Sequence, residues 1–314
     1  MRLAVITGAS SGLGREFALQ ITKKYADEFD EMWLIARRRE QLEELAAQIL
    51  ALCGGQSTDA ADCTPADFAP ADSAAAYYAP AFNAPANRAR AGHVTVRAVP
   101  LDLTSAADLD RFEKMLSEAN AASETPSGSP ASALTVTWLV NAAGLGRFGR
   151  SEDIPRSSQR GMIDLNCGAL VEVTAICVPY LARKAHVLQI ASTAGFQPFQ
   201  FLNIYAATKA FVLRYSQALA WELAGRRVRV TAVCPYWVKD TEFIGIAKET
   251  GGKRANRHYP LASKTKNVVA RALAVNRTGY WVATPSLVSF VHRIWTKISP
   301  TAAQMGVYEL IRRL

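Results

Sequence analysis

Three residues in the second half of the chain have the types and spacing for proton transfer. Ser192 precedes Tyr205 by thirteen residues, and Lys209 follows the tyrosine by four. Four residues make about one helical turn, so Tyr205 and Lys209 would share a helix face. A free phenol has a pKa near ~10, and a nearby ammonium would lower that pKa by stabilising the phenolate. The pattern predicts a tyrosine that exchanges a proton with a substrate oxygen held by Ser192.

The same tyrosine–lysine spacing occurs a second time, at Tyr180 and Lys184. Tyr180 precedes the expected strand 187–191, whereas Tyr205 follows it. The residue thirteen positions before Tyr180 is Cys167, not a serine. A serine just past a strand and a tyrosine on the next helix can converge on one oxygen. We therefore predict that Tyr205 is catalytic and that Tyr180 is a structural residue at a helix end.

Apolar runs alternate with helical patterns along most of the chain. The first strand precedes a glycine-rich turn and the amphipathic segment Arg15–Tyr25, and the second precedes the charged helix Glu40–Leu52. Apolar strands separated by helices predict a doubly wound α/β fold, with a parallel sheet covered on both faces. The seven expected strands are Leu3–Thr7, Met32–Ala36, Val94–Leu101, Thr135–Val140, Val187–Ala191, Val228–Val233 and Tyr280–Ala283.

The segment Thr7–Gly14 follows the first strand directly. In a Rossmann-type sheet, this turn brings backbone amides and a helix N-terminus against a dinucleotide pyrophosphate, and glycines permit the close approach. A second glycine pattern, Gly144–Gly149, has the formal spacing of a dinucleotide-binding turn but lacks its context. Pro155 comes soon after it, so no helix begins promptly. We expect the second pattern to be a loop near the cofactor. The predicted contacts in the first turn are Gly8, Ser10, Ser11, Gly12, Leu13 and Gly14.

The end of the second strand carries arginines. A carboxylate there would favour NAD by binding the ribose hydroxyls, whereas arginine favours the additional phosphate of NADP. Arg37 and Arg38 are the candidates for that phosphate, through charge-assisted hydrogen bonds. The alternative is that both only form the charged first turn of the next helix. We expect NADP(H) to be preferred and NAD(H) to be possible.

With these motifs in order, the chain resembles the short-chain dehydrogenase/reductase family over residues 1–284, apart from two insertions. Thr7–Gly14 looks like the cofactor turn of its ordinary single-domain branch. The resemblance implies that Asp102 and Leu103 approach the adenine, and that Asn166 is a catalytic asparagine anchoring a water that relays protons. It also implies that a strand-four motif stabilises the sheet and lines the cofactor, with contacts from Asn141, Ala142 and Gly144.

The resemblance implies that Ser192, Tyr205 and Lys209 complete a catalytic tetrad with Asn166, and that Lys209 also binds the nicotinamide ribose. The expected function is NADP(H)-dependent interconversion of a ketone or aldehyde and a hydrophobic, secondary alcohol by hydride transfer. The alternative is a non-catalytic nucleotide-sensing or interaction protein on the same fold. Loss of a tetrad residue would favour that alternative, and the sequence has lost none.

One segment departs from the family pattern. Where the family usually has Pro-Gly after the sixth strand, this chain has Pro235 and Tyr236. Contacts of Pro235, Val238 and Thr241 with the nicotinamide are expected, but Tyr236 leaves their geometry open. The aromatic residues there could instead line a substrate pocket, with Phe196, Phe199 and Phe201 supplying more of the wall, or they could be ordinary core.

Composition sets broad limits. The net charge of +9 fits an anionic cofactor, an acidic substrate, a membrane surface or simply a solvated basic surface. Five cysteines lack zinc-ligand spacing, so neither a metal site nor a disulfide framework is indicated, and the setting is expected to be reducing and cytoplasmic. We expect no nucleic acid partner, and the resemblance implies a homodimer or homotetramer formed through the helices around Asn166 and Tyr205.

Three segments lie outside the core pattern. Residues 54–93, rich in alanine and proline, and residues 120–133 are expected to be surface insertions or disordered loops. The tail, residues 285–314, has apolar residues at helical spacing with His292, Arg293 and Lys297 among them, and a second helix is expected over Ala302–Arg313. We expect such a tail to pack on the parent domain or on a neighbouring subunit. Two alternatives stay open: the tail could enclose an apolar substrate, or it could contact a membrane surface peripherally.

Overall fold

A parallel sheet forms the centre of the molecule. The computed structural model describes residues 1–53, 88–91, 94–123, 133–249 and 261–313. Within these residues the sheet has eight strands in the order β3-β4-β2-β1-β5-β6-β7-β8, and all neighbours are parallel except β3 and β4. The strands are β1 (Arg2–Thr7), β2 (Glu31–Ala36), β3 (Arg88–Ala91), β4 (Val94–Pro100), β5 (Thr135–Asn141), β6 (Leu181–Ile190), β7 (Arg229–Val233) and β8 (Val282–Ala283).

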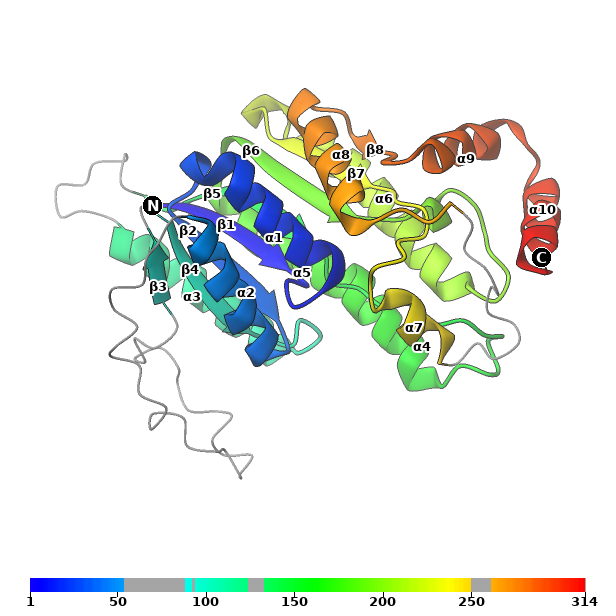
Figure 1. Cartoon of the computed structure of the whole chain (residues 1–314), viewed down its shortest axis with the longest axis horizontal. Helices are drawn as coiled ribbons and strands as arrows, with labels where there is room; N and C mark the ends of the chain where they lie inside the picture. The colour runs from blue at the N-terminus through cyan, green and yellow to red at the C-terminus, as the bar shows by residue number, and fades with distance from the viewer. Residues whose placement is uncertain (54–87, 92–93, 124–132, 250–260, 314) are drawn as a thin grey trace.

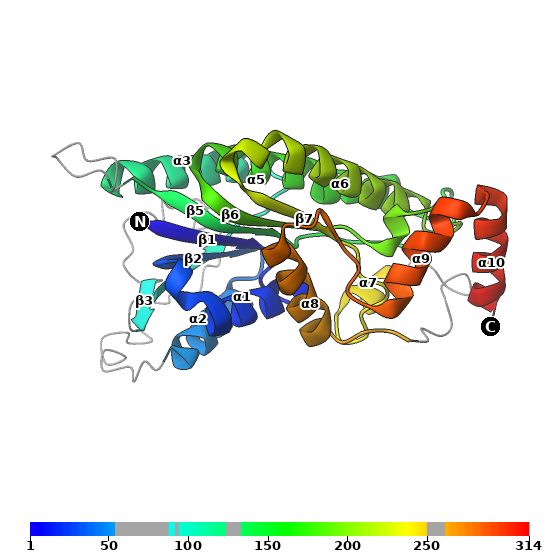
Figure 2. The same cartoon turned by 90° about the horizontal axis from the view of Figure 1, so that it is seen from above.

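Helices cover both faces of this sheet. Figure 2 shows α3, α5 and α6 on one face and α1, α2 and α8 on the other. The order reverses between β1 and β5, which opens a crevice at the carboxyl ends of the strands. The helices are α1 (Gly12–Tyr25), α2 (Arg39–Leu52), α3 (Ala106–Ser123), α4 (Arg156–Ile163), α5 (Ala169–Cys177), α6 (Asn203–Glu222), α7 (Phe243–Lys248), α8 (Thr265–Thr278), α9 (Leu287–Ile298) and α10 (Thr301–Arg313).

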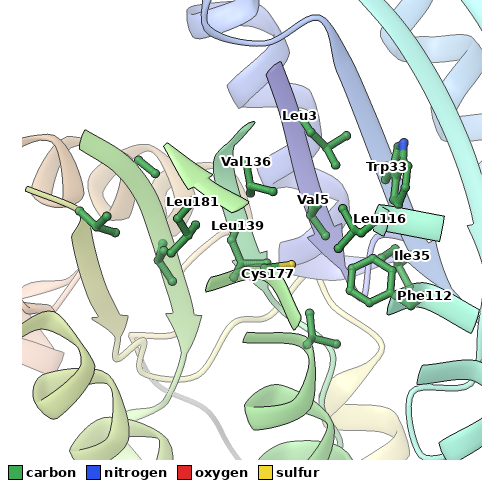
Figure 3. Close-up of a cluster of buried hydrophobic side chains, with 14 of the residues drawn as sticks. Leu3, Val5, Trp33, Ile35, Phe112, Leu116, Val136, Leu139, Cys177 and Leu181 are labelled. Carbon is green, nitrogen blue, oxygen red and sulfur yellow. The ribbon is translucent and has the colours of Figure 1, made fainter. Parts of the chain in front are cut away.

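Two buried apolar layers hold the helices against the sheet. On the α3 and α5 side, Val5 and Leu139 point from the strands toward Phe112 and Cys177 of the helices (Figure 3). A second cluster on the opposite face joins the central strands to α1, α2 and α8. Strands buried on both faces read as continuous apolar runs, which is why the sequence identifies them readily. The predicted doubly wound fold with seven parallel strands is confirmed.

Several boundaries differ from the expected ones. Strand β6 begins at Leu181, whereas the sequence predicts a start at Val187. The prediction is late because Arg183, Lys184 and His186 interrupt the apolar pattern in the first half of the strand. The antiparallel edge strand β3 lies inside the expected insertion 54–93, the rest of which lies outside the described residues. Helix α3 extends to Ser123, into the second expected insertion.

One helical run, Arg156–Tyr180, is long and apolar enough to cross a membrane by length and composition. It contains α4, a π-helical segment η8 (Asp164–Gly168) and α5. Its Val173 and Cys177 are buried against the sheet, and a core helix of this kind meets the same criterion. Of its most apolar 18-residue window, 39% is buried, so packing in the layered core explains part of its apolar composition.

The tail forms α9 and α10 at the end of the molecule away from the N-terminus (Figure 1). Ser286 caps α9 through a reciprocal capping box with Ser289. Arg271 of α8 donates a hydrogen bond to the Pro285 carbonyl oxygen at 2.8 Å. In α10, Gln304 and Tyr308 are buried, so the tail packs on the parent domain.

Candidate active site

A cavity of about 1090 Å³ lies at the carboxyl ends of the strands. The glycine turn after β1, the arginines after β2 and the loop after β5 line one part of it. Ser192, Tyr205 and Lys209 line the middle, and residues of α9 and α10 line the remainder. Sixteen predicted cofactor contacts also border this cavity; they are Gly8, Ser10, Ser11, Gly12, Leu13, Arg37, Arg38, Asp102, Leu103, Ala142, Gly144, Tyr205, Lys209, Pro235, Val238 and Thr241.

The glycine turn follows from steric limits on the backbone. Gly8 has φ +66°, and a Cβ there would lie 2.6 Å from the Ala143 amide nitrogen. Gly12, at φ +54°, begins α1, so the free amides of that helix end face the cavity. Thr7 Oγ1 accepts hydrogen bonds from the amides of Ala142, at 3.1 Å, and Ala143, at 3.3 Å. This contact joins the turn to the end of β5.

Three predicted site residues do not line the cavity. Gly14 is buried where a Cβ would overlap the carbonyl of Gly8, so it permits close packing of α1 on the turn. The Asn141 side chain is buried and donates to Thr174 Oγ1 at 3.0 Å, which places it inside the sheet–helix layer. Asn166 lies behind the cavity wall. Gly14 and Asn141 therefore do not border the cavity, and their contact with the cofactor stays a prediction.

Positive charge gathers where β2 ends. Arg37 and Arg38 are both exposed on the cavity rim. Arg38 donates to Glu242 at 3.0 and 3.1 Å and to Ser10 Oγ at 3.2 Å. Burial of Asp102 opposes its ionisation, but hydrogen bonds from Thr104 and the charge of Arg37 together hold its pKa below the ordinary value. Arg38 thus joins the end of β2 to Glu242 across the cavity, while the charge of Arg37 favours the ionised form of Asp102.

Ser192 and Tyr205 are brought together by two different elements. Ser192 follows β6 directly, and its Oγ accepts a hydrogen bond from the Ala194 amide at 3.1 Å. Tyr205 lies in the first turn of α6 and is buried. Burial raises the pKa of Tyr205 to about 12, and a hydrogen bond with Ser192 opposes that rise. The phenol is therefore protonated at neutral pH and contacts the serine, as the thirteen-residue spacing predicts.

Lys209 lies one turn further along α6. Its Nζ is 5.6 Å from the centre of the Tyr205 ring and donates to the Ile190 carbonyl oxygen at 2.7 Å. Burial lowers the pKa of Lys209 to about 8. The expectation that this ammonium gives Tyr205 a lowered pKa is wrong for the protein alone, because burial disfavours both the phenolate and the ammonium.

Asn166 occupies the π-helical segment η8, where the extra residue per turn aims its side chain at two neighbouring elements. Its Oδ1 accepts from the Leu145 amide, and its Nδ2 donates to the Leu145 carbonyl oxygen, each at 2.9 Å. Nδ2 also donates to Thr208 Oγ1 at 3.0 Å. Asn166 therefore fixes the glycine-containing loop after β5 to the helix that carries Tyr205 and Lys209.

The segment after β7 closes over the glycine turn. The Thr193 amide donates to the Pro235 carbonyl oxygen at 3.0 Å. A Cβ at Gly12 would lie 3.4 Å from Thr241 Cγ2, so the segment reaches the start of α1. Of the expected aromatic wall, Phe199, Tyr236 and Trp237 line the cavity, whereas Phe196 and Phe201 do not.

Sequence reasoning missed several residues at the cavity. Glu242, Phe243 and Gln197 border it without belonging to any motif. The sequence identifies the tail as amphipathic, and the structure shows which of its residues face the cavity. These residues are Leu287, Val288, Val291, His292, Trp295, Gln304, Val307, Tyr308 and Ile311. Among the described residues there is no group of three or more His, Cys, Asp or Glu side chains that could hold a metal ion.

Comparison with known proteins decides the family. The family model described as "short chain dehydrogenase" matches residues 82–250, just over half of the chain. The protein belongs to the short-chain dehydrogenase family. It is accordingly an oxidoreductase with an NAD(P)-binding Rossmann fold. Residues 82–250 include Asn166, Ser192, Tyr205 and Lys209.

Relatives of the protein match different shares of the chain. An uncharacterized oxidoreductase of Myxococcus xanthus is 28% identical over 76% of this chain and 72% of its own length. The NADP-dependent 3-hydroxy acid dehydrogenase YdfG of Escherichia coli is 34% identical over 49% of this chain and 62% of its own length. A very-long-chain 3-oxoacyl-CoA reductase of Pyricularia oryzae is 26% identical over 75% of this chain and 56% of its own length.

Solved short-chain dehydrogenases share the fold over nearly the whole chain. A short-chain dehydrogenase from Sphingobium yanoikuyae in complex with NADPH has a TM-score of 0.66 and 26% identity, covering 100% of this chain and 97% of that one. A bulky-bulky ketone specific alcohol dehydrogenase from Comamonas testosteroni has a TM-score of 0.64 and 23% identity, with coverage of 100% and 96%. At 23% identity, the similarity to the Comamonas testosteroni enzyme shows a shared fold and nothing more.

Proposed function

We propose that this protein is an NADP(H)-dependent reductase that interconverts a hydrophobic ketone or aldehyde and the corresponding alcohol. One observation carries the proposal. Ser192, Tyr205 and Lys209 border the same cavity as the glycine turn and the apolar face of the tail. Proton-transfer groups, a dinucleotide site and an apolar compartment therefore adjoin one another.

The residues around the cavity fit a dinucleotide. Gly8 and Gly12 leave open a backbone cradle at the start of α1, where the helix dipole favours a pyrophosphate. Arg37 and Arg38 supply guanidinium donors for a 2′-phosphate. The nicotinamide, when bound, supplies or accepts the hydride. A relative and a structural neighbour are named for NADP or hold NADPH, which supports the same preference here.

In reduction, the chain's own residues would hold the carbonyl oxygen and give it a proton. Ser192 Oγ would donate a hydrogen bond to the oxygen, and Tyr205 would transfer its phenolic proton to it. The charge on Lys209 would stabilise the phenolate left behind. Asn166 would keep α6 aligned with the loop after β5 while this happens. A phenol pKa of about 12 supports the acid role at neutral pH.

The substrate is proposed to be apolar around its reacting carbonyl. Leu202, Trp237 and Phe243 border the cavity beside Tyr205, and Tyr205 and Phe243 have ring centres 5.2 Å apart. Two relatives are named for a 3-hydroxy acid and a 3-oxoacyl-CoA, so 3-oxoacyl esters and thioesters belong among the compounds to test.

The first experiment measures binding and turnover separately. Purified protein is titrated with NADPH and NADH, and the complexes are then mixed with alkyl ketones, aryl ketones and 3-oxoacyl esters. We expect NADPH oxidation with formation of the matching alcohol. Tight NADPH binding without reduction of any compound would instead favour the non-catalytic nucleotide-sensing alternative.

Cofactor preference is tested at Arg37. Arg37→Ala should weaken NADPH binding by about tenfold or more while changing NADH binding little, because a guanidinium–phosphate hydrogen bond contributes roughly 1.5–3 kcal/mol. Arg39→Ala is the matched control, because Arg39 is exposed, pairs with Glu43 and does not border the cavity. Equal loss of both cofactors in Arg37→Ala would contradict the phosphate assignment.

A further inference from the structure

One acidic side chain reaches the basic end of the cavity. Glu242 precedes α7, and its carboxylate accepts two hydrogen bonds from Arg38, from Nη1 at 3.1 Å and from Nη2 at 3.0 Å. Both residues border the cavity, and the side chains of Glu242 and Arg38 are 53% and 42% exposed. The pair is therefore open to a ligand in the cavity, and it occupies an arginine that a 2′-phosphate would also use.

The hydrogen bonds of Arg38 leave no free fork for a phosphate. A guanidinium has five N–H groups, and a phosphate takes two adjacent ones in its strongest contact. Glu242 takes one N–H from each terminal nitrogen, and Ser10 Oγ accepts the other from Nη2 at 3.2 Å. The two N–H groups that remain, on Nε and Nη1, point from opposite edges of the guanidinium plane. A two-bond phosphate contact at Arg38 must therefore replace Glu242 or Ser10.

Charge decides which of these two residues opposes a phosphate. Ser10 is neutral, whereas the hydrogen bond from Arg38 holds the pKa of the Glu242 carboxyl below its ordinary value, against the effect of burial. A phosphate monoester carries about −1.5 to −2 charges at pH 7. If the carboxylate leaves, its two charge-assisted hydrogen bonds are lost, and if it stays, it repels the phosphate. A dinucleotide without the 2′-phosphate meets neither cost.

The segment that carries Glu242 has other anchors on both sides of this residue. Asp240 accepts hydrogen bonds from the Thr265 amide at 2.8 Å and from Thr265 Oγ1 at 3.0 Å, at the start of α8. The Ala247 carbonyl oxygen accepts from the Phe148 amide at 2.9 Å. These bonds hold the segment whichever partner Arg38 has, so the Glu242 carboxylate is able to give up the arginine without releasing the segment.

We propose that Glu242 is a specificity-determining residue that competes with the 2′-phosphate of the cofactor for Arg38 and so limits the preference for NADP(H) over NAD(H). This deepens the proposed function, on which it rests for the position of the phosphate beside Arg37 and Arg38. The ligand class to which Glu242 responds is any adenosine nucleotide with a 2′-phosphate.

The test measures nucleotide binding by calorimetric titration. Adenosine 2′,5′-bisphosphate and adenosine 5′-monophosphate differ only in the 2′-phosphate, and neither reaches the proton-transfer residues. Glu242→Gln retains the size of the side chain and removes its charge. This variant should bind the bisphosphate and NADPH about fivefold more tightly than wild type, with less than about a twofold change for the monophosphate and NADH. Unchanged or weaker binding of the two 2′-phosphate ligands would overturn the proposal.

Glu249 provides the control for loss of a negative charge on the same segment. It pairs with Arg147 at 2.7 Å and does not border the cavity. Glu249→Gln should leave the affinities for NADPH and NADH within about twofold of wild type. A gain for NADPH as large as that in Glu242→Gln would indicate a general effect of net charge and would contradict competition at Arg38.

A double-mutant cycle tests whether Glu242 acts through Arg38. Arg38→Met should weaken binding of the bisphosphate. In that background Glu242→Gln should tighten binding by less than about twofold, because no guanidinium remains to compete for. A fivefold gain in both backgrounds would show that Glu242 acts independently of Arg38, against the proposal.

The binding test and the turnover test can fail separately. If no ketone is reduced but Glu242→Gln still tightens binding of the bisphosphate, the reductase function fails and competition at Arg38 stands. If ketones are reduced with NADPH while Glu242→Gln leaves every nucleotide affinity unchanged, competition at Arg38 fails and the reductase function stands.

Discussion

Tyr205 and Lys209 share a helix face, and burial disfavours the charged form of both, so it shifts their pKa values in opposite directions. The pKa of Tyr205 is raised to about 12 and that of Lys209 is lowered to about 8. Within the usual range of assay pH, Tyr205 is therefore always protonated and Lys209 is the group that titrates. The structure favours a phenol that acts as an acid in carbonyl reduction over a phenolate that acts as a base.

A pH dependence follows at the residue scale. Lys209 loses its proton as the pH rises through about 8, and with it the charge that stabilises the phenolate formed during reduction. The kcat/KM for ketone reduction should therefore be level below that pH and decline above it. A pH–rate profile at saturating NADPH measures this limb. The Lys209→Met variant should have a low kcat/KM that does not decline as the pH rises. A wild-type kcat/KM that stays level to about pH 10 would contradict the assignment of Lys209 as the titrating group.

The residues of the site could be predicted unequally from the sequence. Ser192, Tyr205 and Lys209 are found because they lie close together along one strand and the helix after it. Glu242 is not, because its partner Arg38 is 204 positions away and ion pairs of that separation leave no local pattern. Asn166 is found by resemblance, yet its π-helical setting and its bonds to Leu145 depend on packing that spacing does not encode.

At the scale of elements, the turn after β1 depends on backbone freedom at Gly8. The positive φ and the close Ala142–Ala143 backbone leave no room for a side chain there. The turn is predictable for this reason, since only glycine fits at little cost. The start of strand β6 is expected too late in the sequence because the exposed residues Arg183 and Lys184 interrupt its apolar pattern.

Gly8→Ala tests this element. The substitution should lower the Tm and weaken NADPH binding by about fivefold or more, because the strain and the overlap together exceed roughly 1 kcal/mol. Gly168→Ala is the control, since no atom lies within 4 Å of the position that its new methyl group would take. Calorimetric titration and thermal unfolding measure both effects. Unchanged NADPH affinity in a folded Gly8→Ala variant would disprove the role of the turn.

At the scale of the whole molecule, α9 presents apolar residues on more than one side. Val291 borders the cavity and is 54% exposed, whereas Ile294 is 46% exposed and does not border it. The sequence indicates an amphipathic tail but leaves open whether it packs on the domain, encloses substrate or meets a membrane. Only the folded arrangement separates the residues that face the cavity from those that do not.

These two residues form a matched pair for testing the tail as a substrate wall. Val291→Asp should raise the KM for apolar ketones by about tenfold or more, because a charge beside an apolar ligand is poorly solvated. Ile294→Asp should leave KM within about twofold. Steady-state kinetics with the same ketone measures both. Equal effects would show that the cavity-facing side of α9 has no special part in substrate binding.

Proton donation by Tyr205 to a carbonyl substrate underlies the proposed function, and a single-turnover reaction tests it most directly. Protein loaded with NADPH is mixed with the best ketone, and NADPH loss is followed in wild type, Tyr205→Phe and Tyr180→Phe. Tyr180 has the same lysine spacing but lies outside the cavity lining. We predict a loss of about a hundredfold or more in Tyr205→Phe, with NADPH affinity retained, and little change in Tyr180→Phe. A Tyr205→Phe rate within about threefold of wild type would contradict the mechanism.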